Sequence, residues 1–204
     1  MSTDRTVVPA ATLSGMEGSV LATPQQRLAE ERALAICARP EMAAAKARIT
    51  ALFKADRNAR LADQDGLIAR SAAEHCLHAA LIAASETPRS PCFVWTIAMA
   101  HQWLGLDVPG SRIGQDNPDN VYRFASVDQG LRYTISGKFS AQPPTDFSIC
   151  ALPAQVGDGI AANVCGIITR DTIDLDGDGR FEILVDNTAT DGRRNHLCIA
   201  GAKV

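Results

Sequence analysis

The chain has few aromatic residues, no membrane-length apolar run and no cluster of basic side chains. Aromatic residues make up 5% of its 204 residues. The longest apolar run, Cys92 to Ala100, is too short to span a bilayer. The net charge is −3, and the only adjacent basic residues are Arg193 and Arg194. Because nucleic-acid binding usually requires a clustered basic face, we predict neither a nucleic-acid nor a membrane partner.

An export signal and closely spaced cysteines are also lacking. The first 26 residues include the charged Asp4 and Arg5 and contain no apolar segment of the length that a secretory signal needs. None of the six cysteines stands in a C-x-x-C pair, the spacing of zinc ribbons and thioredoxin-type redox sites. We therefore expect reduced thiols and a cytoplasmic protein.

The first half of the chain has the apolar spacing of helices. After a predicted flexible leader over residues 1–22, Thr23-Pro24-Gln25-Gln26 has the form of a capping box. Pro40 is expected to end the first helix, because it disfavours helical geometry at Arg39. Residues 92–97 have the composition of a strand, whereas 98–104 fit a strand or a helix. Apolar residues at intervals of three and four predict helices over 23–38, 41–58 and 66–85.

From residue 105 onward, short alternating runs replace the helical pattern. Asp128-Gln129-Gly130 lies between the first two runs and predicts a β-hairpin. Several short strands with turns between them favour a sandwich or jelly roll. The last run continues to Val204 without a polar cap, which predicts a last strand whose edge is either unpaired or covered by another segment. The expected strands are 121–127, 131–137, 146–152, 164–172, 180–185 and 196–199.

These patterns predict an α+β fold. About three N-terminal helices are followed by an antiparallel β-sandwich that is jelly-roll-like and incomplete. The expected divisions are the leader over 1–22, a helical region over 23–104 and a β-sandwich region over 105–204.

The segment from Arg112 to Arg123 resembles the signature region of a bacterial family known as domain of unknown function twelve-fourteen. Its letters G-Q-D-N-P-D-N-V-Y-R are followed by Asp128, Tyr133 and Gly137 in the order typical of that family, and by an aspartate-rich turn near residue 176. The resemblance covers roughly residues 67–204 and extends only to the N-terminal portion of such proteins. It implies a jelly-roll sandwich with appended helices, and it implies no particular reaction.

The family-like segment also contains candidate site residues. Asn117-Pro118-Asp119-Asn120 fits a type I turn, and turn formation alone accounts for its composition. A functional interpretation adds a cavity beside the turn. Tyr122 and Arg123 must then point to opposite faces of a strand, with Tyr122 inward. The candidate acid–base or anchoring residues are His101, Asp116, Asp119 and Tyr122, and the candidate ligand-binding residues are Trp95, Trp103 and Arg123.

Two further motifs have the composition of metal sites. Asp174, Asp176 and Asp178 alternate before Gly179, as oxygen ligands do in a calcium loop, but Val185 stands where an EF-hand needs its glutamate. A tight hairpin turn is the competing interpretation. The second motif, Glu74-His75-Cys76-Leu77-His78, has the wrong spacing for a zincin helix. It favours a partly exposed helix face with a Glu–His contact. Calcium is the only cofactor candidate.

No G-x-S-x-G, G-x-G-x-x-G or P-loop motif occurs, so these serine hydrolase and nucleotide-binding sites are disfavoured. Two functions remain open. One is a small-molecule-binding subunit or enzyme that performs lyase- or isomerase-type acid–base chemistry on a small apolar substrate. The other is a non-catalytic module that completes its sheet with a partner chain. Both are compatible with a homo- or hetero-oligomer.

Overall fold

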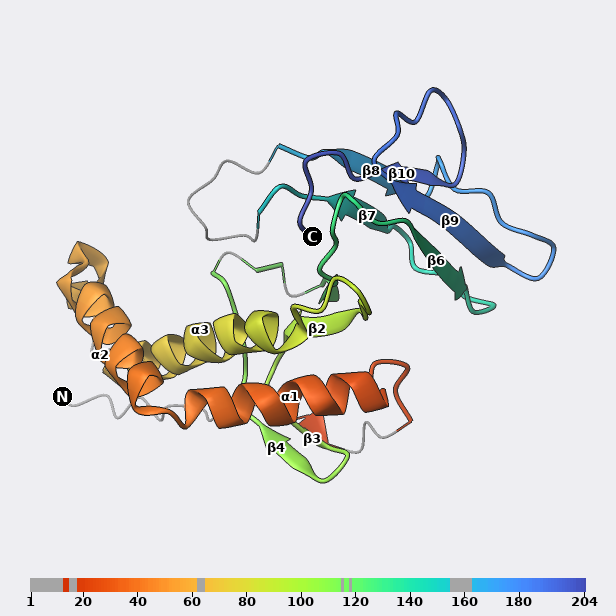
Figure 1. Ribbon diagram of the computed structural model, residues 1–204. Coiled ribbons are helices and arrows are strands. Elements are labelled where there is room, and N and C mark those ends of the chain that lie inside the picture. The colour runs from red at the N-terminus through yellow and green to blue at the C-terminus, as the bar shows by residue number, and fades with distance from the viewer. Residues whose placement is uncertain (1–12, 15–17, 62–64, 115, 118, 155–162) are drawn as a thin grey trace. The chain divides into compact units, whose positions relative to one another are not determined.

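A computed structural model describes residues 13–14, 18–61, 65–114, 116–117, 119–154 and 163–204. The chain folds into two compact units (Figure 1). Unit 1 contains the described residues up to Glu86 and the segment Cys92–Phe124, and unit 2 contains Thr87–Pro91 and Ala125–Val204. Three helices come first and several small sheets follow, which confirms the mixed α+β class.

The three helices of unit 1 are α1 (Pro24–Cys37), α2 (Pro40–Ala55) and α3 (Asp65–Ser85), with a short 3-10 helix over Arg57–Leu61. The hydroxyl of Thr23 accepts a hydrogen bond from the Gln26 N–H at 3.1 Å, so Thr23 is the N-cap of α1. Arg39 has an extended backbone with ψ of 149°. As predicted from Pro40, this residue separates α1 from α2.

The core of unit 1 lies between α1, α3 and two strands. Ala29 and Ala33 of α1 pack with Leu77, Ala80 and Leu81 of α3, and Val94 and Val108 complete the cluster. Alanine side chains allow two helices to approach closely. Leu77 and Leu81 are each 2% exposed, and burial of one leucine contributes about 1.5–3 kcal/mol.

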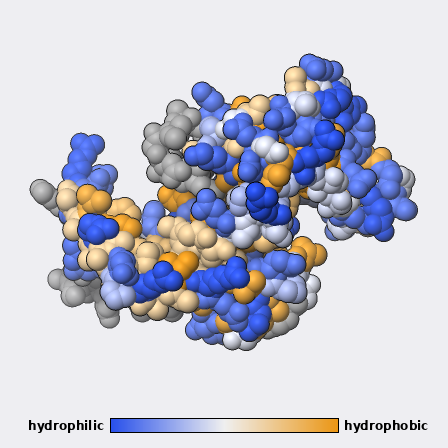
Figure 2. Space-filling view, in the orientation of Figure 1, coloured by the Kyte–Doolittle hydropathy of each residue, from blue (hydrophilic) through white to orange (hydrophobic). Residues whose placement is uncertain are grey.

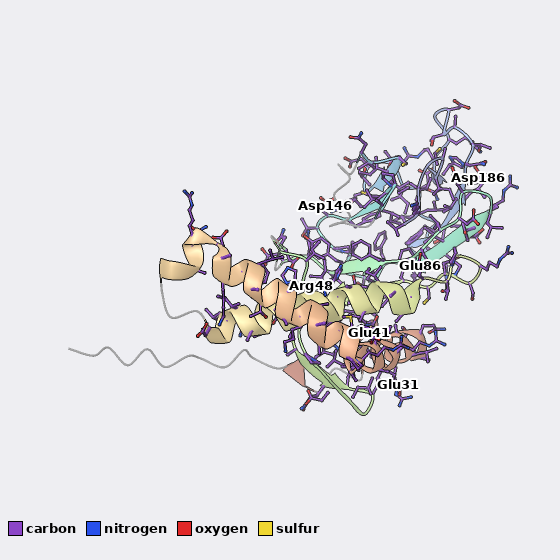
Figure 3. The ribbon with its side chains drawn as sticks, turned by 60° about the vertical axis from the view of Figure 1, so that its left-hand side comes forward. Glu31, Glu41, Arg48, Glu86, Asp146 and Asp186 are labelled. Atoms are coloured by element: carbon purple, nitrogen blue, oxygen red, sulfur yellow. The ribbon has the colours of Figure 1, made fainter. Side chains whose placement is uncertain are left out.

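Helix α2 contributes no buried residue to this core. Leu52, predicted to lie on its apolar stripe, is 71% exposed, and Phe53 is half-buried against the ring of His75. Figure 2 shows orange patches among blue ones over this helix. Glu41 and Arg48, labelled in Figure 3, are exposed on the same helix.

The strands of unit 1 form two small sheets. The strands of the first are β1 (Leu13–Ser14), β3 (His101–Trp103) and β4 (Leu106–Val108), in the order β1-β3-β4; those of the second are β2 (Val94–Ile97) and β5 (Tyr122–Phe124). The turn between β3 and β4 has positive φ at Leu104 and Gly105. Residues 98–104, which fitted either class, therefore contain a strand. Of the predicted leader, Leu13 and Ser14 pair with β3, and residues 1–12 and 15–17 lie outside the described residues.

Unit 2 has two sheets around one core. Strand β9 pairs antiparallel with β6 and parallel with β10, and β7 pairs antiparallel with β8. Ala151, Ile168, Ile183, Val185 and Leu197 from these strands belong to the same buried cluster. The parallel β9–β10 pair departs from the antiparallel sandwich that we predicted. The strands are β6 (Tyr133–Lys138), β7 (Ser148–Ala151), β8 (Gly166–Thr169), β9 (Arg180–Asp186) and β10 (His196–Cys198).

The β-hairpin predicted around Asp128 does not form. The turn itself forms, since the Leu131 N–H donates to the Asp128 carbonyl at 2.9 Å. The strands on its two sides pair elsewhere, β5 with β2 and β6 with β9. A local turn motif fixes the direction of the chain but not the partner of each strand.

The last residues of the chain are hydrogen-bonded within unit 2. The Lys203 N–H donates to the Leu152 carbonyl at 2.8 Å, and the Lys203 carbonyl accepts from Val127 at 2.8 Å. Ala202 is 3% exposed. The residues after β10 are therefore paired with Leu152 and Val127, whereas β10 itself pairs with β9 on one side and lies at the edge of its sheet in the described structure.

Unit 2 also includes the five residues Thr87–Pro91, which come from between α3 and β2. The hydroxyl of Tyr133 donates to the Pro88 carbonyl at 2.9 Å and accepts from the Asp128 N–H at 2.7 Å. The Thr87 N–H donates to the hydroxyl of Ser126 at 2.9 Å. The chain therefore leaves unit 1 after Glu86 and returns to it at Cys92.

All six cysteines lie in the described part of the chain and are free thiols there. Among the helices in the described part of the chain, none combines the length and the apolar character needed to cross a bilayer.

Candidate functional site

A buried polar cluster joins α1 to the strands of unit 1. Gln26 and Glu30 lie one turn apart on α1, and Glu30 is 0% exposed. The Gln26 side chain accepts from the Trp95 N–H at 2.7 Å and donates to the Trp95 carbonyl at 3.0 Å. The Gln26 side-chain amide thus satisfies both backbone groups of Trp95 in β2, as the backbone of a neighbouring strand would.

The Glu30 carboxylate accepts three hydrogen bonds. Gln26 Nε2 donates to Oε1 at 2.7 Å, and Trp103 Nε1 donates to Oε2 at 2.7 Å. His101 Nε2 lies 3.2 Å from Oε1. Its Nδ1 lies 2.7 Å from the Met99 carbonyl, and because a carbonyl only accepts, Nδ1 has a hydrogen. Carboxylate oxygens accept strong hydrogen bonds from N–H donors, so these contacts satisfy the buried Glu30 side chain.

Three predicted site residues, Trp95, Trp103 and His101, meet in this cluster. The His101 ring stacks on Trp95 at a centroid distance of 5.3 Å and contacts the edge of Trp103 at 4.6 Å. Trp103 and His101 are each 1% exposed, and Trp95 is 8% exposed. Since these rings are covered by one another and by α1, the cluster holds the fold together and offers no open face to a ligand. The sequence did not single out Glu30.

A second cluster, which we call the α3–loop site, consists of Glu74, His75 and His78 on α3 and Arg112 and Asp116 in the loop after β4. The Arg112 N–H donates to the Glu74 carbonyl at 3.4 Å, and its guanidinium forms an ion pair with the Glu74 carboxylate. Arg70 Nε lies 3.7 Å from the same carboxylate. The loop therefore covers the face of α3 that we expected to be partly exposed.

Gly110 allows this close approach of the loop to α3. A Cβ at this position would lie 2.9 Å from Glu74 Oε1 and 3.4 Å from the Ala98 carbonyl oxygen. Glu74 is 7% exposed and His78 is 8% exposed. The prediction of a partly exposed helix face with a Glu–His contact is therefore wrong, because two arginines neutralise Glu74 and allow its burial.

His78 is held with one ring nitrogen available. Nδ1 lies 2.9 Å from the Thr96 carbonyl, so Nδ1 has the hydrogen and Nε2 has a lone pair. Burial lowers the pKa of His78, and the nearby His75 lowers it further. The hydrogen bond to Thr96 and the negative charge of Asp116 act in the opposite direction. A neutral imidazole beside a carboxylate is the usual form of a general base.

Asp116 is the predicted catalytic residue that the structure places in this site. Its Oδ2 accepts from the N–H groups of Ile113 at 3.2 Å and Gly114 at 3.3 Å. Its Oδ1 is buried and has no hydrogen-bond partner among the described residues. An unpartnered buried acceptor costs about 1–3 kcal/mol, and such atoms in folded proteins need an explanation such as ligand binding. Thr96 Oγ1 is also buried without a partner in the described structure.

The other predicted residues of the segment stabilise its turn. The Asn120 N–H donates to the Asn117 carbonyl at 3.2 Å, as a β-turn requires. The Tyr122 hydroxyl accepts from Asn117 N and Asn120 Nδ2, each at 3.3 Å. The Asp119 N–H donates to Asn117 Oδ1, and the Asp119 side chain is exposed. Asp119 and Tyr122 therefore belong to the turn and not to the α3–loop site.

Arg123, a predicted ligand-binding residue, lies on β5. Its guanidinium donates to the Phe93 carbonyl at 3.0 Å and lies 5.5 Å from the centroid of the Phe93 ring. Tyr122 and Phe124 are half-buried whereas Arg123 is exposed, as the alternation of a strand requires. The described contacts connect Arg123 with neither His101 nor Asp116.

Two of the three aspartates of the predicted calcium loop, Asp174 and Asp176, are engaged by neighbouring groups. Asp176 Oδ1 accepts from the N–H groups of Asp178 at 2.9 Å and Arg180 at 2.8 Å. These bonds, that from Arg180 first, lower the pKa of Asp176. Asp174 forms an ion pair with Arg194 at 2.5 Å. Throughout the described ranges, no three or more His, Cys, Asp or Glu side chains gather as metal ligands.

Comparison with known proteins assigns no function. No family model matches the sequence, and no curated protein matches it. A similar solved structure is that of an uncharacterised protein from Burkholderia cenocepacia, with 15% sequence identity and a TM-score of 0.46 over 88% of this chain. The chain spans 41% of the length of that protein. This similarity is too distant to support a statement about function.

Proposed function

We propose that the α3–loop site binds a small molecule and performs acid–base chemistry on it, with His78 as the general base and Asp116 as the anchor. The unpartnered, buried Asp116 Oδ1 carries this proposal. His78 supports it, because its Nδ1 is held by the Thr96 carbonyl and the negative charge of Asp116 acts on its pKa. Only a donor from outside the described residues satisfies Asp116 Oδ1. A hydroxyl on a small apolar molecule is such a donor.

The reaction that fits these groups is proton transfer at carbon. The substrate hydroxyl donates to Asp116 Oδ1, and His78 Nε2 removes a proton from the carbon that carries this hydroxyl, while the adjacent carbonyl oxygen takes the electron pair as an enolate. Return of that proton to the former carbonyl carbon, with the hydroxyl proton passing to the former carbonyl oxygen, completes an isomerisation. Departure of a leaving group, with the imidazolium giving it the proton, completes an elimination. Both outcomes preserve the lyase- or isomerase-type class predicted from the sequence.

A small α-hydroxy ketone is a suitable probe. In D2O, exchange of the C2 proton of 2-hydroxycyclohexanone can be followed by proton NMR. We expect the protein to accelerate the exchange, and we expect His78→Gln and Asp116→Asn each to reduce that acceleration at least about 100-fold, the usual contribution of one acid–base group. Asp119→Asn is the matched control, since Asp119 is exposed in the turn and should leave the rate unchanged.

Two results would contradict the proposal. One is an exchange rate that His78→Gln leaves unchanged while the fold is intact by circular dichroism. The other is equal loss of exchange in Asp119→Asn and Asp116→Asn, since this would implicate the turn and not the unpartnered Oδ1.

The alternative of a module that completes its sheet with a partner chain also remains a proposal. In the described structure the last strand, β10, is an edge strand, although Lys203 and Val204 after it are hydrogen-bonded to Leu152. Oligomerisation and a cytoplasmic location remain predictions.

We also retain, as proposals, the jelly-roll sandwich and the membership of the domain of unknown function twelve-fourteen family. Support for the sandwich comes from the shared core of unit 2, in which Ile168 of one sheet and Ile183 of the other belong to one buried cluster. Two packed sheets produce such a cluster. An experimental structure that shows the strand order of unit 2 would test both proposals.

A further inference from the structure

A third group of polar residues lies in unit 2, where the chain passes from β9 to β10. Asp186 is the last residue of β9, and His196 is the first residue of β10. The two strands are parallel, so the nine residues 187–195 return the chain to the start of the neighbouring strand. This return brings Asp186 and His196 together, and each is 4% exposed. Figure 3 labels Asp186.

Asp186 orients the imidazole of His196. Asp186 Oδ1 accepts from His196 Nε2 at 3.0 Å, from the Thr188 hydroxyl at 2.5 Å and from the Thr188 N–H at 2.9 Å. The Thr188 hydroxyl, then the Thr188 N–H, then His196 hold the pKa of Asp186 well below its usual value. An ionised Asp186 only accepts, so His196 Nε2 has the hydrogen.

The other ring nitrogen of His196 faces a hydroxyl. Nδ1 lies 3.3 Å from Thr190 Oγ1. In the neutral imidazole Nδ1 has the lone pair, and the Thr190 hydroxyl donates to it. Within the described structure, no other hydrogen bond engages this hydroxyl, and Thr190 is half-buried. The Thr188 hydroxyl differs, because it donates to Asp186 and accepts from Arg193 at 2.8 Å.

The backbone around Thr190 is held by Arg193. Its guanidinium donates to the Thr190 carbonyl at 3.2 Å and also to the Ala189 carbonyl. Asp191 and Asn195 have positive φ values of 48° and 49°, which are uncommon for residues other than glycine. Strained backbone of this kind is frequent where a loop fixes a functional side chain. Arg193 also places a positive charge beside Thr190.

We propose that Thr190 is a nucleophile that His196 activates and Asp186 orients, and that it accepts acyl groups from small carboxylic esters. Thr190 Oγ attacks the ester carbonyl carbon while its proton passes to His196 Nδ1. The bond from that carbon to the leaving oxygen then breaks, and the leaving group departs with the ester electron pair and receives the proton from the imidazolium. Water repeats the same steps and releases the acid, which restores the Thr190 hydroxyl.

The residues around Thr190 do not form the G-x-S-x-G motif, so a motif search does not find the group Asp186, Thr190 and His196. The same three roles occur on unrelated chains in different orders, and geometry alone identifies them. The competing explanation is that Asp186 and His196 only hold the 187–195 loop in place. In that case the Thr190 hydroxyl has no chemical role, and its removal changes no reaction.

The test uses p-nitrophenyl acetate and the full chain. We expect release of p-nitrophenolate and an acetyl group on Thr190, located by mass spectrometry of peptides from protein quenched in acid. Thr190→Ala should lower the release rate at least about 100-fold, and Thr190→Ser should retain it. His196→Gln should lower it similarly. Thr145→Ala is the matched control, because Thr145 is an exposed threonine of the same unit.

Several outcomes would overturn the proposal. They are the absence of acetylation in the natural sequence, acetyl groups only on lysines, and a release rate that Thr190→Ala leaves unchanged. If His196→Gln does not fold, the two Thr190 variants still decide, since the Thr190 hydroxyl has no structural partner other than His196 in the described residues. His78→Gln is expected to retain this activity, so failure here and failure of the α3–loop proposal are distinguishable.

Discussion

Replacing Glu30 with alanine removes the carboxylate that joins α1 to the strands of unit 1. Three buried donors, on Gln26, His101 and Trp103, lose their acceptor. Removing one member of a buried charged pair usually costs about 3–5 kcal/mol. Each donor left unsatisfied costs about 1–3 kcal/mol. Water that enters the space left by the side chain offsets part of that cost, so we expect Glu30→Ala to lower the free energy of unfolding by about 3–5 kcal/mol.

Glu30→Gln separates the hydrogen bonds from the charge. The glutamine oxygen can still accept from Trp103, and its amide can donate to the lone pair of a neutral His101. Only the Gln26 donor then lacks its partner, which predicts a loss of about 1–3 kcal/mol. Glu31→Ala is the matched control. Glu31, labelled in Figure 3, forms an exposed ion pair with Arg27 at 2.6 Å, and such pairs contribute at most about 1 kcal/mol.

Urea unfolding followed by tryptophan fluorescence measures these differences. The two tryptophans of the chain, Trp95 and Trp103, both belong to the cluster and to unit 1, so the fluorescence reports on unit 1. The reasoning is refuted if Glu30→Ala and Glu30→Gln differ by less than about 0.5 kcal/mol, the error of adding independent effects. It is also refuted if Glu30→Ala costs no more than Glu31→Ala.

Three further predictions follow from packing and protonation. Gly166→Ala should lower the free energy of unfolding, measured by thermal unfolding, by about 1–3 kcal/mol, because the new Cβ would lie 2.4 Å from the Cys198 carbonyl oxygen. Gly177→Ala is the control and should be neutral, since nothing lies within 4 Å of its Cβ. The pKa of His78 is lowered in the folded chain, so below about pH 6.5 the imidazole gains a proton in the unfolded chain but not in the folded one. The free energy of unfolding therefore decreases as the pH falls through this range. Urea titrations of His78→Gln should lack this decrease. The pKa of Asp186 is also lowered, so the stabilisation that its carboxylate provides is complete above about pH 4 and is lost as the pH falls further. Amide hydrogen exchange in β9 should be slower in the natural sequence than in Asp186→Asn above about pH 4, and this difference should disappear in acid.

The helices were predictable because their boundaries depend on adjacent residues. Thr23 and Pro24 begin α1 and Pro40 separates it from α2, as the sequence indicates, although α2 begins at Pro40 itself, one residue before its predicted start. The second hydrogen bond of the predicted capping box, from the Thr23 N–H to the Gln26 side chain, does not form. Gln26 does not bond the Thr23 N–H, which donates instead to the Leu21 carbonyl at 2.9 Å. The Gln26 side chain instead pairs with Trp95, 69 positions away, a contact that local spacing does not reveal.

The site was predictable only in part for the same reason. Asp116 was a candidate because its segment is distinctive, and the structure gives its Oδ1 no partner among the described residues. His78 was considered only as part of a helix face, since nothing in the helix itself indicates that the 110–116 loop covers it. Thr190 and His196 belong together through the return from β9 to β10, and sequence spacing alone does not predict the register of a parallel pair.

The five residues Thr87–Pro91 limit how this gene can be divided. Unit 2 includes them, although the rest of its chain begins 34 positions after Pro91, at Ala125. A fusion or truncation that starts at residue 125 therefore omits Pro88, whose carbonyl accepts from the Tyr133 hydroxyl. A fragment that ends at residue 124 retains the five residues without the unit in which they fold. The coding segments of the two units thus alternate along the gene, and a single recombination point cannot transfer either unit intact to another protein.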